Sequence, residues 1–238
     1  MLTKHLLSQA IFGAVASAVG PFQYYIHGTG DLTNYVNLSP DFKNPADTAS
    51  TQGVKITLDA TAKWNSDMWQ TGLIPQTKAA INSGRVGYHF SMKRTELNPP
   101  NAEYEHQVNF FESHFTKMKY GWVVHGEQGT SNPNLQWMIG GQGKWKTEFT
   151  PDAWYNFAYD IDFGTQTVDL YASTGADPLK VVVPPQSAST SLNGADWHLG
   201  VLRLPRGGSS DTAPEDWYFS GVYVESGEIT TSISGPSA

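Results

Sequence analysis

Hydrophobic and polar residues alternate with a period of two along much of the chain. In GVKITLD, Val54, Ile56 and Leu58 fall on one face, and in RVGYHFSMKR every second residue from Val86 to Met92 is apolar or aromatic. The segments TVDLYAS and WYFSGVYVES repeat this alternation. Because successive side chains of a β-strand point to opposite sides of a sheet, the pattern predicts strands with one buried face.

Polar clusters rich in Gly, Pro, Asn, Asp and Ser separate these segments, among them NPPNAEY, GTSNPN, DFGTQT and PRGGSSD. The one helical candidate is short, PQTKAAINSG at residues 75–84. Many short strands with turns between them and almost no helix are typical of a two-sheet sandwich, a jelly roll or a closed barrel. We therefore expect a single all-β domain, a β-jelly roll sandwich, with a concave face that forms a cleft for a polymer chain.

The first 18 residues have a different pattern. MLTKHLLSQAIFGAVASA starts with a basic Lys4, continues with an apolar run and ends in three small residues. This order predicts a secretory signal peptide over residues 1–18, followed by one domain over residues 19–238. The alternative is an amphipathic first helix. No later run reaches the roughly 20 apolar residues of a membrane span, so we expect an extracellular, secreted protein with no membrane partner.

Composition narrows the function further. The chain of 238 residues has no cysteine and a net charge of -7. It therefore forms no disulfides and no thiolate metal sites, and it lacks the basic surface that nucleic acid requires. Eight Trp and eleven Tyr residues supply rings both for a core and for platforms that contact the faces of sugars.

Two aspartates in YDIDF, Asp160 and Asp162, share a face near a turn. They form either a calcium site or an acidic entry to the turn. Because no ligand spacing of a known calcium loop surrounds them, we favour the turn and expect no metal and no cofactor.

The most polar strand-like segment is EYEHQVNFFESHF, residues 103–115. A carboxylate and an imidazole two residues apart on one strand, as in Glu112 and His114, suit general acid and base catalysis. The alternative is a solvated face or a hydrogen-bond network without a catalytic role. Strict alternation divides the segment into two faces, one with His106, Val108, Phe110, Glu112 and His114 and the other with Glu105, Gln107, Asn109 and Phe111.

A second candidate segment is GADWHLGVLRLPRGG. Alternation places Trp197 and Arg203 on one face and His198 on the other, so the three cannot share a groove without a bulge. The chain has no G-x-S-x-G elbow, no H-E-x-x-H helix and no P-loop. These absences leave carboxylate chemistry on a sugar, or binding without chemistry.

Several strings resemble glycoside hydrolase family 131, a family of secreted fungal β-glucanases. They run from about residue 20 to the C-terminus: PFQYYIHG, YVNLSPDFKNPADT, LIPQTKAAI, EHQVNFFESHFT, WYNFAYDIDF, GADWHLGVLRLPR and DWYFSGVYVESG. The resemblance implies a β-jelly roll with a concave cleft that acts on β-1,3-, β-1,6- and β-1,4-linked glucans. It also implies two catalytic glutamates, one of which is Glu112 in FFESHF.

The chain departs from this family at the other glutamate. The family's string R-T-E-L-I-P-Q-T reads QTGLIPQT here, so Gly72 stands in the place of the glutamate and Gln70 in that of the arginine. Because glycoside hydrolysis needs two carboxyl groups, we expect impaired activity. The resemblance also implies that an N-terminal strand of the family's domain is missing before PFQYYIHG, or that the gene starts further upstream.

Three functions remain open. The first is a β-glucan hydrolase in which a neighbour such as Glu105 or His114 replaces the second carboxyl. The second is a β-glucan-binding protein without catalysis. The third is a glucuronan-type polysaccharide lyase. Its base and its carboxylate-neutralising group would come from His89, His114, Gln107 and Arg203.

The remaining expectations concern supporting residues and partners. We expect His114, Gln107 and His198 to support Glu112 and the Gly72 position. The expected substrate contacts are Gln76, Trp137, Trp197 and Arg203. The expected partner is a β-glucan polysaccharide, bound by a monomer.

Overall fold

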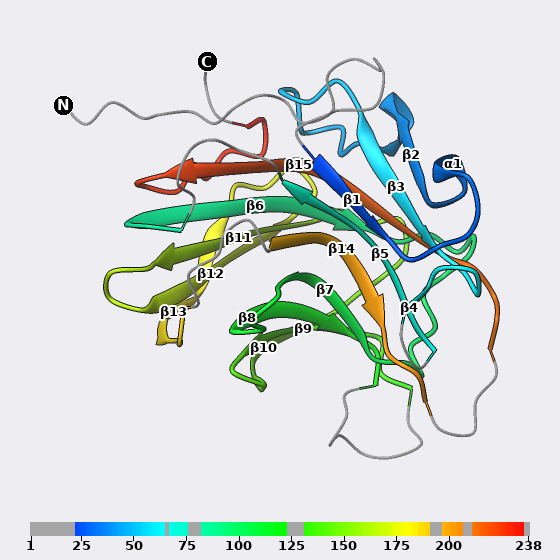
Figure 1. Ribbon diagram of the computed structural model, residues 1–238. Helices are drawn as coiled ribbons and strands as arrows, with labels where there is room; N and C mark the ends of the chain where they lie inside the picture. The colour runs from blue at the N-terminus through cyan, green and yellow to red at the C-terminus, as the bar shows by residue number, and fades with distance from the viewer. Residues whose placement is uncertain are drawn as a thin grey trace.

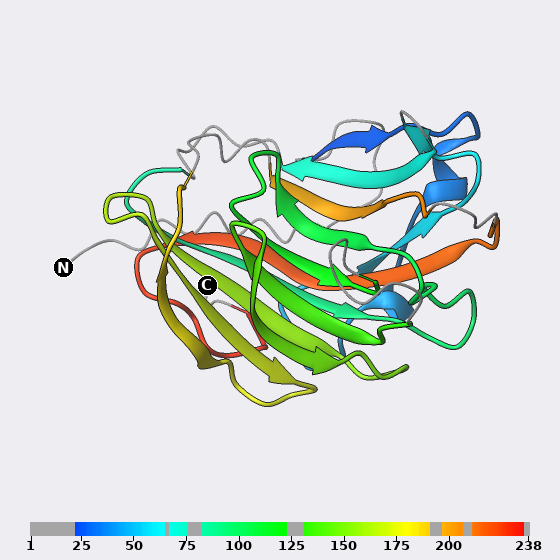
Figure 2. The same cartoon turned by 90° about the horizontal axis from the view of Figure 1, so that it is seen from below.

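Two antiparallel β-sheets pack face to face in the computed structural model (Figures 1 and 2). The structure describes residues 22–64, 67–75, 82–122, 131–190, 197–206 and 211–235. The eight-stranded sheet has the order β1-β5-β14-β7-β8-β9-β10, with β4 beside β5, and the seven-stranded sheet has the order β13-β12-β11-β6-β15-β3-β2. This architecture confirms the predicted all-β sandwich.

The strand bounds are as follows. The eight-stranded sheet contains β1 (Phe22–Ile26), β4 (Lys63–Trp64), β5 (Met68–Pro75), β7 (His106–Phe111), β8 (Thr116–Tyr120), β9 (Asn134–Ile139), β10 (Gln142–Glu148) and β14 (Trp197–Arg203). The seven-stranded sheet contains β2 (Val36–Ser39), β3 (Gly53–Leu58), β6 (Arg85–Lys93), β11 (Tyr155–Asp162), β12 (Thr167–Thr174), β13 (Lys180–Ser187) and β15 (Glu215–Ser226).

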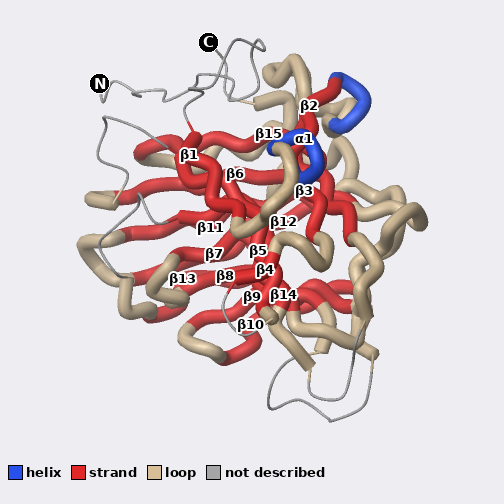
Figure 3. The backbone as a smooth tube through the Cα atoms, turned by 45° about the vertical axis from the view of Figure 1, so that its right-hand side comes forward, coloured by secondary structure: helices blue, strands red, loops and turns tan. Residues whose placement is uncertain are grey.

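Helix is limited, within the described residues, to α1 (Leu32–Tyr35) and the 3-10 turn η1 (Pro40–Phe42). α1 lies beside the edge strand β2 and its neighbour β3 (Figure 3), and η1 contacts β3 and β15. Most of the predicted helix at 75–84 lies outside the described residues, as does the predicted signal peptide. None of the helices that are described is long and apolar enough to cross a membrane.

The core lies between the two sheets and follows the alternation of the sequence. On β6, the even-numbered residues from Val86 to Met92 face inward and are at most 2% exposed. From the opposite sheet, β5 contributes Trp69 and Leu73 and β14 contributes Trp197 to the same cluster. The other side of β5, β14, β7 and β8 faces away from the core, and we call it the site face.

The outer face of the seven-stranded sheet is partly covered by the C-terminal segment, residues 227–235. Thr230 donates from both its backbone N and its hydroxyl to the carboxylate of Glu225. Glu225 also contacts Nε2 of His89 at 2.9 Å, and Leu179 N donates to Thr231 O at 2.8 Å. The C-terminal segment is therefore tied to strand β15 and to the chain just before β13.

Candidate functional site

The centre of the site face is a close approach between two glycines. Gly72 of β5 lies directly opposite Gly200 of β14, and Tyr25 of β1 lies on the other side of Gly72. A Cβ on Gly200 would fall 2.4 Å from the carbonyl oxygen of Thr71 and 2.5 Å from Cα of Gly72. Gly200 is therefore required by packing, because any side chain there would collide with the backbone of β5.

Gly72 is in a different situation. A Cβ on Gly72 would meet its nearest atom at 3.6 Å, and it would lie 3.9 Å from Nδ1 of His198. Its backbone does not have a positive φ. Neither conformation nor space requires a glycine at this position, and a side chain there would point along the site face toward His198.

Two aromatic neighbours fix the imidazole of His198. The ring stacks on Phe110 with 4.7 Å between centroids and 8° between planes, and Tyr25 meets it edge-on at 4.9 Å. His114 stacks on the other face of Phe110 at 5.3 Å. Nε2 of His198 lies 3.1 Å from a carboxylate oxygen of Glu112, whose side chain is 62% exposed. The stack thus presents one accessible carboxylate on an oriented imidazole.

The alternation predicted for residues 103–115 is wrong after Val108. Asn109 has a φ of 45°, and the register between β7 and β14 shifts between His198 and Val201. Val108 and Phe111 both face the core as a result, while Phe110 lies on the site face. The side chain of Asn109 holds this irregularity by accepting from Gly200 N at 3.1 Å. A β-bulge of this kind re-aims side chains next to a site.

A polar network crosses the site face beside this stack. Lys117 Nζ lies 3.1 Å from Nδ1 of His114 and donates to Oε1 of Gln107 at 3.2 Å. Gln107 in turn donates to Glu105, which forms an ion pair with Lys119. His114 therefore contacts the stack through Phe110, and Lys117 links it to Gln107.

Burial sets the charge states in this network. Burial, reinforced by the charge of Lys117, lowers the pKa of His114 to about 4, so its imidazole is neutral above that pH. Burial, with the nearby charge of Lys119, lowers the pKa of Lys117 to about 8. His114 therefore serves as a hydrogen-bond acceptor for Lys117 at neutral pH.

Three of the predicted substrate contacts are in the core. Trp137 and Trp197 are both 0% exposed, and Trp137 donates to the hydroxyl of Thr116 at 2.9 Å. Arg203 is 2% exposed and is bound between the two sheets to Glu215. These side chains have no surface for a sugar, which corrects the prediction. Gln76 lies outside the described residues.

The groups suggested for a lyase are not brought together. His89 lies on the outer face of the seven-stranded sheet with Glu225, far from His114 and Gln107 in the topology. Because Arg203 is buried in an ion pair, it cannot neutralise a uronate on the site face. Among the described residues, the four groups suggested for β-elimination therefore do not form one site.

The suggested calcium site is instead a pair of separate hydrogen-bonded groups. Asp160 is bound by the guanidinium of Arg85, and Asp162 accepts from the backbone N of Gly164 and Thr165. Within the described ranges no group of three or more His, Cys, Asp or Glu side chains is placed to hold a metal ion.

Sequence reasoning missed Phe110, Tyr25 and Lys117. The alternation in TKMKY predicts Lys117 and Lys119 on one face, and in β8 the two side chains join one network through Gln107 and Glu105. No pattern in the sequence links Tyr25 to His198, because their strands meet only through β5.

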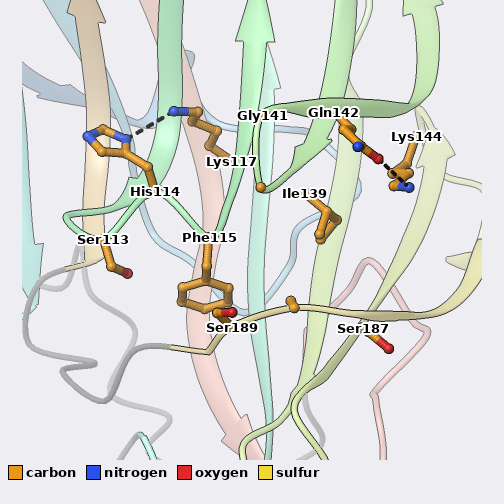
Figure 4. Close-up of a pocket in the computed structure, with 12 residues that line it drawn as sticks. Ser113, His114, Phe115, Lys117, Ile139, Gly141, Gln142, Lys144, Ser187 and Ser189 are labelled. Atoms are coloured by element: carbon orange, nitrogen blue, oxygen red, sulfur yellow. Dashed lines mark hydrogen bonds between the residues drawn. The ribbon is translucent and has the colours of Figure 1, made fainter.

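A pocket of about 600 Å³ opens next to the turn after β7 that carries Glu112, and residues of both sheets line it (Figure 4). Three segments form it: the turn before β8 with the start of that strand, the β9–β10 hairpin, and residues 187–189 at the end of β13. The hairpin tip is built from Gly140 and Gly141, which have φ values of 52° and 83°.

Comparisons with known proteins agree on one family. A model of the glycoside hydrolase 131 catalytic N-terminal domain matches residues 3–230. The chain is similar to the family 131 β-glucanase catalytic domain from Podospora anserina, with 54% identity and a TM-score of 0.88 over 98% of this chain and 96% of that one. It is also similar to the catalytic domain of the family 131 protein from Coprinopsis cinerea, with 51% identity and a TM-score of 0.82 over 90% and 86%. A comparison with curated proteins gave no match.

Proposed function

The chain belongs to glycoside hydrolase family 131, and we propose that it binds β-glucan along the site face but hydrolyses it only weakly. The expected substrates are β-1,3/1,6- and β-1,4-linked glucans, and Glu112 is the catalytic carboxyl that remains. We also propose that the protein is secreted, which rests on the signal-peptide pattern of residues 1–18.

The observation that carries this proposal is the free space at Gly72. A side chain fits there without a collision. It would approach Nδ1 of His198, whereas Glu112 contacts Nε2 of the same ring. A glutamate at this position would therefore place a second carboxyl on the other side of His198. Inverting and retaining glycosidases both depend on two carboxyls that flank the scissile bond.

Among the residues that the structure describes, the neighbouring acidic groups do not replace this carboxyl. The three central strands β5, β14 and β7 contain no Asp or Glu. Glu105 and Glu112 lie at opposite ends of β7, which by the rise of a β-strand is roughly 20 Å. Catalytic carboxyl pairs are about 5 to 9.5 Å apart. Because Glu105 is also paired with Lys119, it is held away from the reaction.

His114 is a poor substitute as well. Its Nδ1 is engaged by Lys117, and its lowered pKa makes it a weak base. A site with a single carboxyl loses several orders of magnitude in rate, on the order of 4 kcal/mol or more in transition-state stabilisation. Binding along the site face does not need the second carboxyl and persists.

The test is sugar release from a β-1,3/1,6-glucan and a β-1,4-glucan by the natural protein and by Gly72→Glu. We expect the variant to release at least about a hundredfold more sugar, because general acid and base groups contribute on that scale. Gly72→Gln is the matched control, since it adds the same volume without a carboxyl, and it should show no gain. Glu112→Gln in the Gly72→Glu background should abolish the gain.

Binding is measured separately, by retention of the natural protein on insoluble β-glucan. If the natural protein already hydrolyses glucan at an enzyme-like rate that Glu112→Gln abolishes, another residue is the second carboxyl and Gly72 is not the cause of weak activity. If the protein neither binds nor hydrolyses any β-glucan, the proposed substrate is wrong.

A further inference from the structure

The pocket beside Glu112 is basic. Its lining includes Lys117 and Lys144 and contains no Asp or Glu among the described residues. Hydroxyl groups of Ser113, Ser187 and Ser189 add further donors around its rim (Figure 4). An acidic protein with a net charge of -7 thus has a local cavity of the opposite sign. Low-dielectric walls focus the potential of such a cavity.

Lys117 is the buried cation of this pocket. The residue is 7% exposed, and within the described part of the chain its hydrogen-bond partners, Gln107 and His114, are both uncharged acceptors at neutral pH. Glu105, whose charge attracts Lys117, forms its ion pair with Lys119. A buried ammonium without a directly bonded carboxylate is costly, so an anion that enters the pocket gains a favourable partner.

His114 adds a hydrogen-bond donor, because its contact with Lys117 fixes which ring nitrogen carries the hydrogen. Because Nδ1 of the neutral ring accepts from Lys117, the ring hydrogen is on Nε2. A ligand near this nitrogen therefore meets an N–H donor. On the other side of the pocket, Lys144 is exposed and projects from the β9–β10 hairpin. Its Nζ donates to Oε1 of Gln142 at 3.2 Å.

From this arrangement we propose that the pocket binds the carboxylate of a uronic acid residue carried by a glucan chain. Lys117 and Lys144 provide the charges, and His114 and the serine hydroxyls bond the remaining oxygen atoms of the sugar. The volume of about 600 Å³ accommodates a sugar ring with its carboxylate. The inference rests on the proposed function only in placing neutral sugars of the same chain on the site face next to Glu112.

The experiment compares two small probes that differ only at C6, methyl β-glucuronide and methyl β-glucoside, by calorimetry. The glucuronide makes one more charge-assisted contact than the neutral sugar does. We therefore expect it to bind about tenfold more tightly. Added salt should weaken the binding of the glucuronide and leave the binding of the glucoside unchanged. Lys144→Gln, at an exposed position that does not threaten folding, should bring the ratio of the two affinities close to one.

Lys117→Met is the second variant, and it should reduce the same ratio. Lys180→Gln is the matched control, because Lys180 is an exposed lysine at the far end of β13, and the ratio should be unchanged. Equal affinity for both sugars in the natural protein overturns the proposal. So does binding of inorganic phosphate without any preference for the glucuronide.

A third ligand, a neutral β-1,3-linked glucan oligosaccharide, separates this inference from the proposed function. Glucuronide preference without binding of the neutral oligosaccharide supports the pocket and contradicts the proposed glucan site. Binding of the neutral oligosaccharide without glucuronide preference supports the proposed glucan site and contradicts the uronate pocket.

Discussion

Arg203 stabilises one end of the core through two kinds of contact. Its guanidinium lies between the rings of Trp69 and Tyr104, 4.1 and 3.6 Å from their centroids. It donates to the carboxylate of Glu215 at 3.0 Å, and Glu215 also bonds Nε2 of His106 at 2.7 Å. Planar stacking and bonding of a carboxylate at once are properties of arginine that lysine does not share.

We expect Arg203→Met to lower the free energy of unfolding by about 3 kcal/mol or more, because it leaves the buried Glu215 without its main cation. Urea unfolding measures this change. The control is Arg206→Met, since Arg206 pairs with the half-exposed Glu103 and its loss should cost less than about 1 kcal/mol. Equal effects of the two variants would show that the buried pair adds nothing to stability.

Arg203 also shows what alternation can and cannot predict for a residue. The sequence correctly places Arg203 with Trp197 and opposite His198. It does not tell which of the two faces is buried, because β14 has polar residues on both. Trp69 of β5 and Glu215 of β15 contact Arg203, and the alternation within β14 contains no information about these partners. The pattern therefore predicts a substrate contact where the structure has a buried ion pair.

The pairing of β5 with β14 leaves room for a side chain at one of two facing glycines and excludes it at the other. The backbones approach closely at Gly72 and Gly200, and the added Cβ at Gly200 collides while the one at Gly72 does not. The sequence alone gives no reason to distinguish them. Gly200 lies where the register of β14 on β7 shifts, whereas the pairing of β5 with β14 keeps one register.

We expect Gly200→Ala to destabilise the protein by more than about 1 kcal/mol, because the methyl group pushes β14 away from β5. Gly72→Ala should be neutral or stabilise the protein by about 0.5 kcal/mol, since alanine restricts the unfolded chain and fits the folded one. Thermal unfolding of both variants tests the pair. A destabilising Gly72→Ala would mean that the position has less room than the structure shows, and would weaken the interpretation of Gly72→Glu.

Strand existence and sheet class were predictable, whereas bulges and partners were not. The alternation on β3, β6 and β12 matches the observed core faces because these strands run without interruption. On β7 and β15 the pattern breaks where the register shifts, and β15 turns at Gly221 with a φ of 57°. A bulge depends on the hydrogen bonds of the neighbouring strand, which one segment of sequence does not contain.

At the scale of the whole molecule, one carboxylate couples stability to pH. Glu225 is nearly buried, and burial alone would raise its pKa, but hydrogen bonds from His89 and Thr230 hold the pKa below the ordinary value of 4.5. A folded-state pKa below the unfolded one means that the ionised group stabilises the fold. That stabilisation is complete above the ordinary value and is lost as the pH falls through the lowered pKa.

We expect Glu225→Gln to reduce stability at pH 7 by about 1 to 3 kcal/mol and to flatten the loss of stability between pH 5 and 3. The measurement is the unfolding free energy from urea titrations across this range. Amide hydrogen exchange should show the first change in the C-terminal segment, which Glu225 holds. Parallel pH curves for the two proteins would contradict the coupling.

The pairing of β5 with β14 also has a consequence for the order in which the molecule is made. Residues of β5 leave the ribosome more than a hundred residues before those of β14, and β14 separates β5 from β7 in the sheet. Sheets built from such distant segments pay the entropy of loop closure before their contacts form, and they fold slowly. The site face is therefore completed only after β14 is synthesised. Until then, the side of β5 that pairs with β14 is an exposed strand edge, which a chaperone is suited to protect.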